Sequence, residues 1–265
     1  MKKFALIGNQ ISHSKSPELF RKAFPGSGMS YDLIERDTVE QSIACLKEKG
    51  YGGANVTAPF KESAMQFVTD PDPVSKALGA TNLILFRNDK VFSYNTDYLA
   101  VRRMVRELRT RLCKSDYTAA AVIGCGGAGK AAALACLDEG LHTFISNRTM
   151  KKAEDFARNI SGYHYELEAI SIAEAISMLK KTDGSFLVIY TIPAPDGVLS
   201  EVLKSCSQAG QEMACNNPSS RITVIEANYK DPCLNPESGI RWLKYQAVES
   251  FRLMTGIAPN ESRFQ

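Results

Sequence analysis

The sequence predicts an α/β fold with two domains, and three observations lead to this prediction. Short apolar runs alternate with amphipathic stretches along the chain, which is typical of parallel α/β architecture. A long amphipathic helix is expected over 98–112, because valines and leucines share one face among arginines. Beyond it, a new α/β unit begins with the apolar run 119–123, which has the character of a buried parallel strand.

The expected elements follow one another in a regular order. In the first domain, the patterns predict strands at 3–7, 31–35 and 53–56, helices at 17–24, at 39–48 and from Pro59, and a hairpin of 82–86 and 90–94 around Asn88-Asp89. In the second domain, they predict strands at 119–123, 141–146, 185–190 and 221–226, and then a helix over 241–255 that ends at Gly256. We expect a mixed, mainly parallel sheet in residues 1–100, completed by the C-terminal helix within 240–265, and a second domain over 101–239.

The bulk composition argues against several classes of protein. A formal net charge of +3 is too small to indicate nucleic acid or an anionic membrane surface as a partner. No apolar run approaches the roughly 20 residues that span a bilayer, and the apolar start is too short for a signal-peptide core. The cysteines and histidines are scattered, so no metal site is expected, and reduced thiols indicate a cytoplasmic protein. The sequence leaves a monomer and a homodimer open.

A glycine-rich turn follows the strand at 119–123 and opens an alanine-rich helix expected over 130–139. Its sequence is Gly124-Cys125-Gly126-Gly127-Ala128-Gly129. The G-x-G-x-x-G spacing provides a tight turn, close backbone approach to a pyrophosphate and close packing of helix on strand. The following helix N-terminus offers free N–H groups to phosphates. We therefore expect Gly124, Gly126, Gly127, Ala128 and Gly129 to bind a dinucleotide in a Rossmann-like domain, with an ordinary glycine-rich turn as the alternative.

The same turn also fits a second phosphate-binding pattern. Residues 124–130 match G-x-x-x-x-G-K, the phosphate loop of nucleoside triphosphatases. That motif requires Ser or Thr at the next position, whose hydroxyl binds magnesium. Ala131 stands there instead, so the dinucleotide interpretation is favoured over a kinase.

The end of the next strand indicates which dinucleotide binds. A NAD-binding fold usually places Asp or Glu about 20 residues after the first glycine, to bind the ribose 2′-hydroxyl. Here the stretch reads Ser146-Asn147-Arg148-Thr149, without a carboxylate. Asn147 and Thr149 can donate hydrogen bonds, Arg148 can pair with a 2′-phosphate, and Lys152 adds positive charge. The sequence favours NADP(H), with a solvated basic loop as the alternative.

Two serines in the first domain precede an expected helix. Ser16 stands before Pro17 and is expected to be its N-cap, with proline at the first helical position. Ser14 has no such local role. Two hydroxyls at a helix N-terminus also suit the binding of a substrate carboxylate.

A lysine and an aspartate are candidates for proton transfer. Lys61 is expected in the first turn of the helix from Pro59, where a cation opposes the helix dipole by roughly 0.3–1 kcal/mol. A placement that costs stability in this way suits a lysine that transfers protons. Thr57 is either a cap of that helix or part of a site. Asp97 is either the N-cap of the long helix or a carboxylate that orients the Lys61 ammonium.

Seven segments together resemble the shikimate dehydrogenase family. Asn55-Val56-Thr57-Ala58-Pro59-Phe60-Lys61 resembles its N-V-T-x-P-F-K signature. The other six, in family order, are Ser12–Pro17, Gly79–Asn82, Asn95–Asp97, Gly124–Ala128, Asn147–Thr149 and Tyr245–Ala247. The resemblance covers nearly the whole chain, and ordered segments are far more specific than any one alone.

The resemblance implies NADPH-dependent, reversible reduction of 3-dehydroshikimate to shikimate, in aromatic amino acid biosynthesis through chorismate. It implies a substrate-binding first domain, an NADP-binding second domain, and Lys61 and Asp97 as the catalytic pair. Ser14 and Ser16 would bind the substrate carboxylate near Thr57. The residues that it places around the rest of the substrate are Asn55, Asn82, Asp97, Tyr229 and Gln246. Two alternatives remain, a quinate-using relative and a non-catalytic NADP(H)-binding protein; a polar helix face would also explain Gln246, and a half-buried strand end Tyr229.

The chain departs from the family pattern at three places. Phe20-Arg21 stands where the family usually has His-Asn, and Tyr98 follows Asp97 where a small residue is common. The family's N-x-T-x-x-G-M stretch in the nucleotide domain is replaced by the segment 190–197, Tyr-Thr-Ile-Pro-Ala-Pro-Asp-Gly. This last change bears on the pocket for the nicotinamide.

Overall fold

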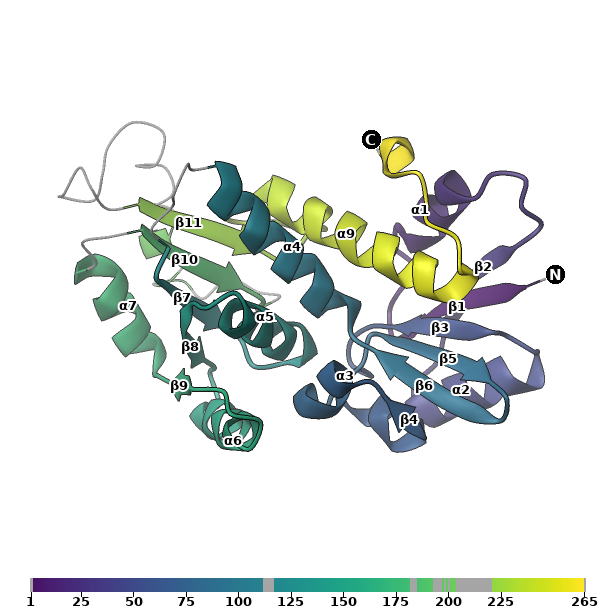
Figure 1. Ribbon diagram of the computed structural model, residues 1–265, viewed down its shortest axis with the longest axis horizontal. Coiled ribbons are helices and arrows are strands. Elements are labelled where there is room, and N and C mark those ends of the chain that lie inside the picture. The colour runs from purple at the N-terminus through teal and green to yellow at the C-terminus, as the bar shows by residue number, and fades with distance from the viewer. Residues whose placement is uncertain are drawn as a thin grey trace. The chain divides into compact units, whose positions relative to one another are not determined.

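The computed structural model describes residues 2–111, 117–181, 185–192, 197, 199, 201–203 and 221–264. The chain divides into two compact units (Figure 1). Unit 1 comprises Met1–Leu99 and Lys244–Gln265, and unit 2 comprises Ala100–Leu243. Each unit contains one β-sheet, which agrees with the predicted α/β fold class.

Unit 1 is built on a mixed six-stranded sheet. Its strands are β1 (Lys3–Gly8), β2 (Ser30–Glu35), β3 (Gly53–Val56), β4 (Asp70–Pro71), β5 (Leu83–Arg87) and β6 (Lys90–Tyr94). They lie in the order β2-β1-β3-β5-β6-β4. β1 pairs in parallel with β2 and β3, whereas β5 is antiparallel to both β3 and β6. The hairpin turns through Asn88 and Asp89, both at positive φ, as the favoured two-residue hairpin turn requires.

Several helices accompany the sheet of unit 1. They are α1 (Ser16–Ala23), α2 (Val39–Glu48), η1 (Ser63–Phe67), α3 (Pro73–Leu78), η2 (Glu261–Phe264), the start of α4 (Thr96–Arg111) and the last part of α9 (Pro236–Thr255). An aromatic cluster joins three of these elements. The Phe20 ring of α1 lies 5.0 Å from that of Tyr31 in β2 and 4.9 Å from that of Phe251 in α9. Such contacts add to the area that the rings bury, so they hold the end of α9 in the core of unit 1.

Unit 2 contains a parallel five-stranded sheet. Its strands are β7 (Ala119–Ile123), β8 (His142–Ser146), β9 (Leu167–Ala169), β10 (Ser185–Tyr190) and β11 (Arg221–Glu226), in the order β11-β10-β7-β8-β9. The connecting helices are α5 (Gly127–Asp138), α6 (Met150–Ser161) and α7 (Ile172–Lys181). The strand order reverses between β7 and β10, and ligands of such sheets bind beyond the carboxyl ends of the strands at this point. The glycine-rich turn directly follows β7.

One predicted element is wrong, and several were not anticipated. No α-helix begins at Pro59: residues 58–62 form turns, and the 3₁₀ helix η1 follows. The N–H groups of Phe60 and Met65 bond to carbonyls three residues earlier, which is the tighter 3₁₀ spacing. The helices α4, α5 and α9 begin at 96, 127 and 236, earlier than expected. The described elements without a sequence-based prediction are β4, α3, α6, β9, α7 and the 3₁₀ helix η2.

Two further predictions extend outside the described residues. These are the end of the long helix at 112 and residues 193–196 of the segment that departs from the family pattern. Among the helices of the described part of the chain, none is long and apolar enough to cross a membrane.

Candidate active site

Lys61 and Asp97 form an ion pair in unit 1. The distance from Lys61 Nζ to Asp97 Oδ2 is 2.6 Å, and the two side chains are 17% and 7% exposed. Lys61 lies in the turn that follows β3, and Asp97 lies in the first turn of α4. The carboxylate is nearly buried, while the lysine keeps some access to solvent, as a group that exchanges a proton with a ligand requires.

The structure corrects the reason for which Lys61 was singled out. Without an α-helix from Pro59, the lysine does not oppose a helix dipole, and Thr57 is not a helix cap. Its backbone is instead fixed by the segment that precedes β5, because the N–H of Thr81 donates to the Lys61 carbonyl at 2.8 Å. The pairing with Asp97, and not a helix terminus, is therefore the physical feature that distinguishes this lysine.

Asp97 is not the N-cap of α4. That role falls to Asn95, whose Oδ1 accepts a hydrogen bond from the N–H of Tyr98 at 3.2 Å. The Nδ2 of Asn95 donates to the carbonyl of Ala80 at 3.1 Å, which ties the start of the helix to the segment before β5. Since Asn95 satisfies the helix end, the Asp97 carboxylate is available to Lys61, in a position where the helix N-terminus favours negative charge.

Three of the predicted substrate residues meet in one buried network. Asn82 Oδ1 accepts from the N–H of Thr96 at 2.7 Å, and Asn82 Nδ2 donates to Thr96 Oγ1 at 3.0 Å. The same hydroxyl lies 3.5 Å from Gln246 Oε1, and Asn55 donates to the Asn82 carbonyl at 3.1 Å. Sequence reasoning missed the roles of Thr96 and of Ser250, which joins this network from α9.

Ser14, and not Ser16, makes the side-chain hydrogen bond at the start of α1. Ser16 is the first residue of α1 and not its N-cap, which is Lys15, without a capping side-chain bond. Ser14 Oγ accepts from the N–H of Ser16 and donates to Ser16 Oγ, both at 3.2 Å. Ser14 thus fixes the helix start, because its hydroxyl serves a donor that α1 leaves without a helical partner. Thr57 lies half-buried after β3, against the end of β1 at Gly8.

The glycine-rich turn of unit 2 has the shape that a pyrophosphate needs. Gly124 has a φ of +109°, which side-chain-bearing residues rarely adopt. A Cβ on Gly129 would overlap the carbonyl oxygen of Gly124, so only glycine permits this contact of helix and turn. A Cβ on Gly126 would meet nothing within 4 Å, which leaves its backbone open to a ligand. With α5 beginning at Gly127, these residues fit a dinucleotide.

Of the predicted cofactor residues after β8, one supports the glycine-rich turn and three are exposed to solvent. Asn147 Oδ1 accepts from the N–H of Cys125 at 3.2 Å, and its Nδ2 donates to the Thr149 carbonyl at 3.0 Å. Asn147 therefore holds the glycine-rich turn. Arg148, Thr149 and Lys152 are exposed around the start of α6, whose first turn contains no acidic residue. Such a cationic helix N-terminus suits a phosphate dianion.

Tyr229 lies in unit 2, in the segment between β11 and α9, and is half-buried. The segment is anchored by Glu226, whose carboxylate is 1% exposed. It accepts hydrogen bonds from the N–H groups of Cys233, Leu234 and Asn235 at 3.0, 2.8 and 2.9 Å. A lone glutamate at a strand end carried no sequence signal for this structural role.

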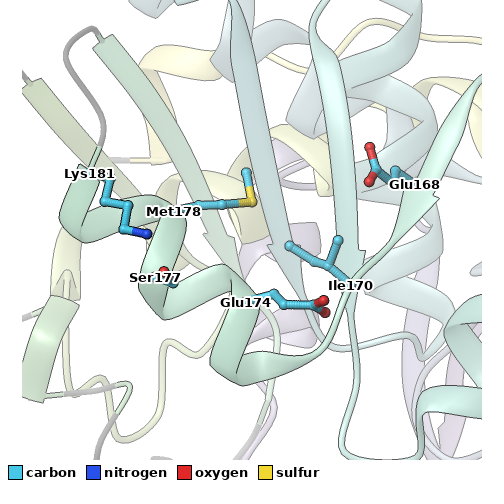
Figure 2. Close-up of a pocket in the computed structure, with 6 residues that line it drawn as sticks. All are labelled: Glu168, Ile170, Glu174, Ser177, Met178 and Lys181. Carbon is cyan, nitrogen blue, oxygen red and sulfur yellow. The ribbon is translucent and has the colours of Figure 1, made fainter.

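A separate pocket of about 480 Å³ lies in unit 2 (Figure 2). It is lined by Glu168 of β9, by Ile170, and by Glu174, Ser177, Met178 and Lys181 of α7. The Glu174 carboxylate accepts from the N–H of Ser171 at 2.8 Å and so caps α7. None of the predicted site residues lines this pocket.

Comparison with known proteins gives one consistent result. The family model described as "Shikimate dehydrogenase substrate binding domain" matches residues 6–84. A protein of Methanococcoides burtonii named shikimate dehydrogenase (NADP(+)) is 30% identical over 269 residues, covering 98% of this chain and 94% of the relative. A Bacillus subtilis protein of the same name is 30% identical over 272 residues, with the same two coverages.

Solved structures share the fold. Shikimate 5-dehydrogenase of Thermus thermophilus, in complex with NADP(H) and shikimate, gives a TM-score of 0.75 at 23% identity, over 100% of this chain and 97% of that one. Quinate dehydrogenase of Corynebacterium glutamicum, in complex with NAD, gives 0.78 at 19% identity, over 99% and 96%. From the relatives at 30% identity over nearly its whole length, this chain belongs to the shikimate dehydrogenase family.

Proposed function

We propose that this chain catalyses the NADPH-dependent, reversible reduction of 3-dehydroshikimate to shikimate, within aromatic amino acid biosynthesis through chorismate. The observation that carries the proposal is the ion pair of Lys61 with the nearly buried Asp97, in a chain of this family. The reaction is tested by following the absorbance of NADPH when the enzyme is supplied with NADP⁺ and either shikimate or quinate. No NADPH formation with either substrate would contradict the proposal.

In this proposal the two residues of the pair have distinct roles. Bound NADPH supplies the hydride for the ring ketone. Lys61 donates a proton to the oxygen that becomes the new hydroxyl, and in the reverse direction it accepts that proton. Asp97 keeps the ammonium of Lys61 in place through the 2.6 Å contact and also accepts a hydrogen bond from a ring hydroxyl of the substrate. A non-catalytic NADP(H)-binding protein would have no use for this pair.

The remaining substrate contacts follow from the hydrogen-bonding capacity of each side chain. Ser14 and Ser16 bind the carboxylate at the start of α1, with Thr57 nearby. Asn82 Nδ2 uses one of its two hydrogens on Thr96 within the described contacts, so the other is available to a ring hydroxyl. Both hydrogens of Asn55 Nδ2 are used inside the protein, so Asn55 binds a hydroxyl only as an acceptor. Gln246 and Tyr229 complete the proposed set.

The proposal also assigns roles to the two parts of the chain. Residues 1–100, with the C-terminal helix within 240–265, bind the substrate, and residues 101–239 bind NADP(H). Gly124, Gly126, Gly127, Ala128 and Gly129 serve the pyrophosphate. Asn147 positions this turn, while Arg148, Thr149 and Lys152 receive the 2′-phosphate. We propose a cytoplasmic monomer or homodimer, in keeping with the free cysteines among the described residues.

Quinate is the second candidate substrate. Relatives of the same fold include the quinate dehydrogenase of Corynebacterium glutamicum. Quinate carries an additional hydroxyl next to its carboxylate, and the mutually bonded hydroxyls of Ser14 and Ser16 leave less room for it than one serine would. We therefore expect a higher kcat/KM with shikimate than with quinate in the assay above.

Replacement of Arg148 by alanine is expected to weaken NADPH binding by about 10- to 100-fold, because a hydrogen bond to a charged group contributes roughly 1.5–3 kcal/mol. NADH lacks the 2′-phosphate, so its affinity is expected to stay nearly unchanged. The measurement is the dissociation constant of each cofactor, obtained from quenching of protein fluorescence. The Arg148→Ala variant should fold normally, since the side chain is exposed.

Arg158→Ala is the matched control for this prediction. Arg158 is an exposed arginine of α6, the helix that begins two residues after Arg148, and its NH1 pairs with Asp155 at 3.0 Å. Its removal changes the net charge equally but takes away no residue of the proposed 2′-phosphate site. If Arg148→Ala weakened both cofactors equally, or no more than Arg158→Ala does, the 2′-phosphate assignment would be wrong.

A further inference from the structure

Ser250 is a buried serine in the second half of α9, in the part of that helix that belongs to unit 1. It is 0% exposed. A serine inside a helix commonly bonds to the backbone carbonyl four residues earlier. This one bonds to two other side chains: its Oγ accepts from Asn55 Nδ2 at 2.8 Å and lies 2.8 Å from Thr96 Oγ1. Ser250 thus joins α9 to the end of β3 and the start of α4.

The side-chain amides of the proposed substrate site contact two neighbouring hydroxyls, those of Ser250 and Thr96. Asn55 bonds to Ser250, and Asn82 bonds to Thr96. Gln246 precedes Ser250 by four residues, so the two side chains lie on the same face of α9. Its Oε1 is 3.5 Å from Thr96 Oγ1.

The network fixes the orientation of the Asn55 amide at three points. Its Nδ2 donates to the Asn82 carbonyl and to Ser250 Oγ, and its Oδ1 accepts from the Tyr31 hydroxyl at 2.8 Å. A rotated amide would turn its oxygen toward the carbonyl oxygen of Asn82, which offers no hydrogen. If the Ser250 hydroxyl were absent, one Asn55 hydrogen would lose its acceptor in a buried place.

We propose that Ser250 is a positioning residue of the substrate site. Its hydroxyl orients the amide of Asn55 directly, and through Thr96 it sets the placement of Asn82 and Gln246. Ser250 thereby determines which atoms of these amides face a bound polyhydroxylated ring. The inference rests on the proposed function, because it takes the ring to be that of shikimate.

The test is Ser250→Ala, measured in the full-length enzyme. The KM for shikimate, and its dissociation constant by isothermal titration calorimetry, are expected to rise about tenfold, as for the loss of one hydrogen bond in a coupled network. The kcat is expected to stay within about threefold of wild type, and the dissociation constant of NADP⁺ should not change. A general loss of structure would weaken the binding of both shikimate and NADP⁺, and not of shikimate alone.

Ser75→Ala is the matched control. Ser75 is also 0% exposed and lies in unit 1. Its Oγ is 2.6 Å from that of Ser93, so its replacement breaks a different buried pair of hydroxyls. It bonds to none of the proposed site residues within the described contacts. Its removal is expected to lower thermal stability and to leave the KM for shikimate unchanged. An equal rise of KM in both variants, or no rise in Ser250→Ala, would overturn the proposal.

Tyr31→Phe provides a second and milder variant in case Ser250→Ala does not fold. It removes only the hydroxyl that holds Asn55 Oδ1, and it keeps the ring contacts with Phe20 and Phe251. A raised KM for shikimate is expected, and an unchanged KM would contradict the proposal. A wild-type enzyme that binds no shikimate would overturn both this inference and the proposed function. A wild type that oxidises shikimate, with variants of unchanged KM, would overturn this inference alone.

Discussion

Replacement of Lys61 by alanine is expected to lower kcat for shikimate oxidation by about 10²–10⁴-fold, the range that a general acid–base group contributes. The affinities for NADP⁺ and shikimate should change far less, because the lysine acts on the hydroxyl that reacts. Alanine also removes the cation next to the nearly buried Asp97 carboxylate, and loss of a close charge partner destabilises a fold. The rate measurement therefore needs a variant that keeps a hydrogen bond to this carboxylate.

Lys61→Gln is that variant. Its amide can donate a hydrogen bond to Asp97, but it cannot deliver a proton, so we expect the same loss of kcat with a smaller loss of thermal stability. Lys90→Ala is the control: Lys90 also pairs with an aspartate of unit 1, Asp70, at 3.1 Å, but both side chains are exposed. Steady-state kinetics and thermal unfolding of the three variants test whether Lys61 transfers the proton. Near-wild-type kcat in Lys61→Gln would show that another group handles the proton.

The strands were predicted well because each carries its own local signal. The run at 119–123 is apolar throughout and the run at 185–190 is apolar after its first residue, as strands buried on both faces are, and they match β7 and β10 residue for residue. Asn88-Asp89 supplied the hairpin turn in the same way. In contrast, the two residues of β4 are too few to show any periodicity. Local sequence thus predicts the elements whose residues interact mainly with their sheet.

The helix from Pro59 was predicted wrongly because a proline at the start of a polar segment is equally compatible with a turn. The position of this proline cannot distinguish an α-helix from consecutive i, i+3 turns. The two differ in which carbonyl accepts from each N–H, and the proline does not determine this. The cap predicted for α1, and the capping alternative for Asp97 in α4, were wrong for a related reason. Ser16 and Asp97 are suitable caps by residue type, but Ser14 and Asn95 make the bonds.

The site itself depends on contacts between residues far apart in the chain. Lys61 and Asp97 are 36 positions apart, and Thr96 and Ser250 are 154 apart. No periodicity or spacing specifies such pairs. The resemblance of ordered motifs pointed to the first pair, because both members lie in family signatures. Ser250 lies outside those signatures, so only the three-dimensional arrangement reveals its partners.

Replacement of Gly126 by alanine is expected to weaken NADP(H) binding at least tenfold with little effect on the free enzyme. Gly126 has φ −89° and ψ −176°, which alanine readily adopts, and its added methyl group would meet nothing within 4 Å in the protein alone. Loss of glycine at this N-cap position costs at most about 1 kcal/mol. The methyl group would, however, occupy the space through which the backbone approaches a pyrophosphate.

Gly129→Ala is expected to act in the opposite way to Gly126→Ala, because it lowers the stability of the free enzyme directly. Its methyl group would overlap the carbonyl oxygen of Gly124, so the turn and α5 must separate. Overpacking of this kind costs about 1–3 kcal/mol or more, and thermal unfolding of the free enzyme should occur at a clearly lower temperature. Cofactor titrations and thermal unfolding of both variants separate the two causes. If Gly126→Ala bound NADPH as wild type does, the pyrophosphate would lie elsewhere, and the turn would serve only to pack α5 against β7.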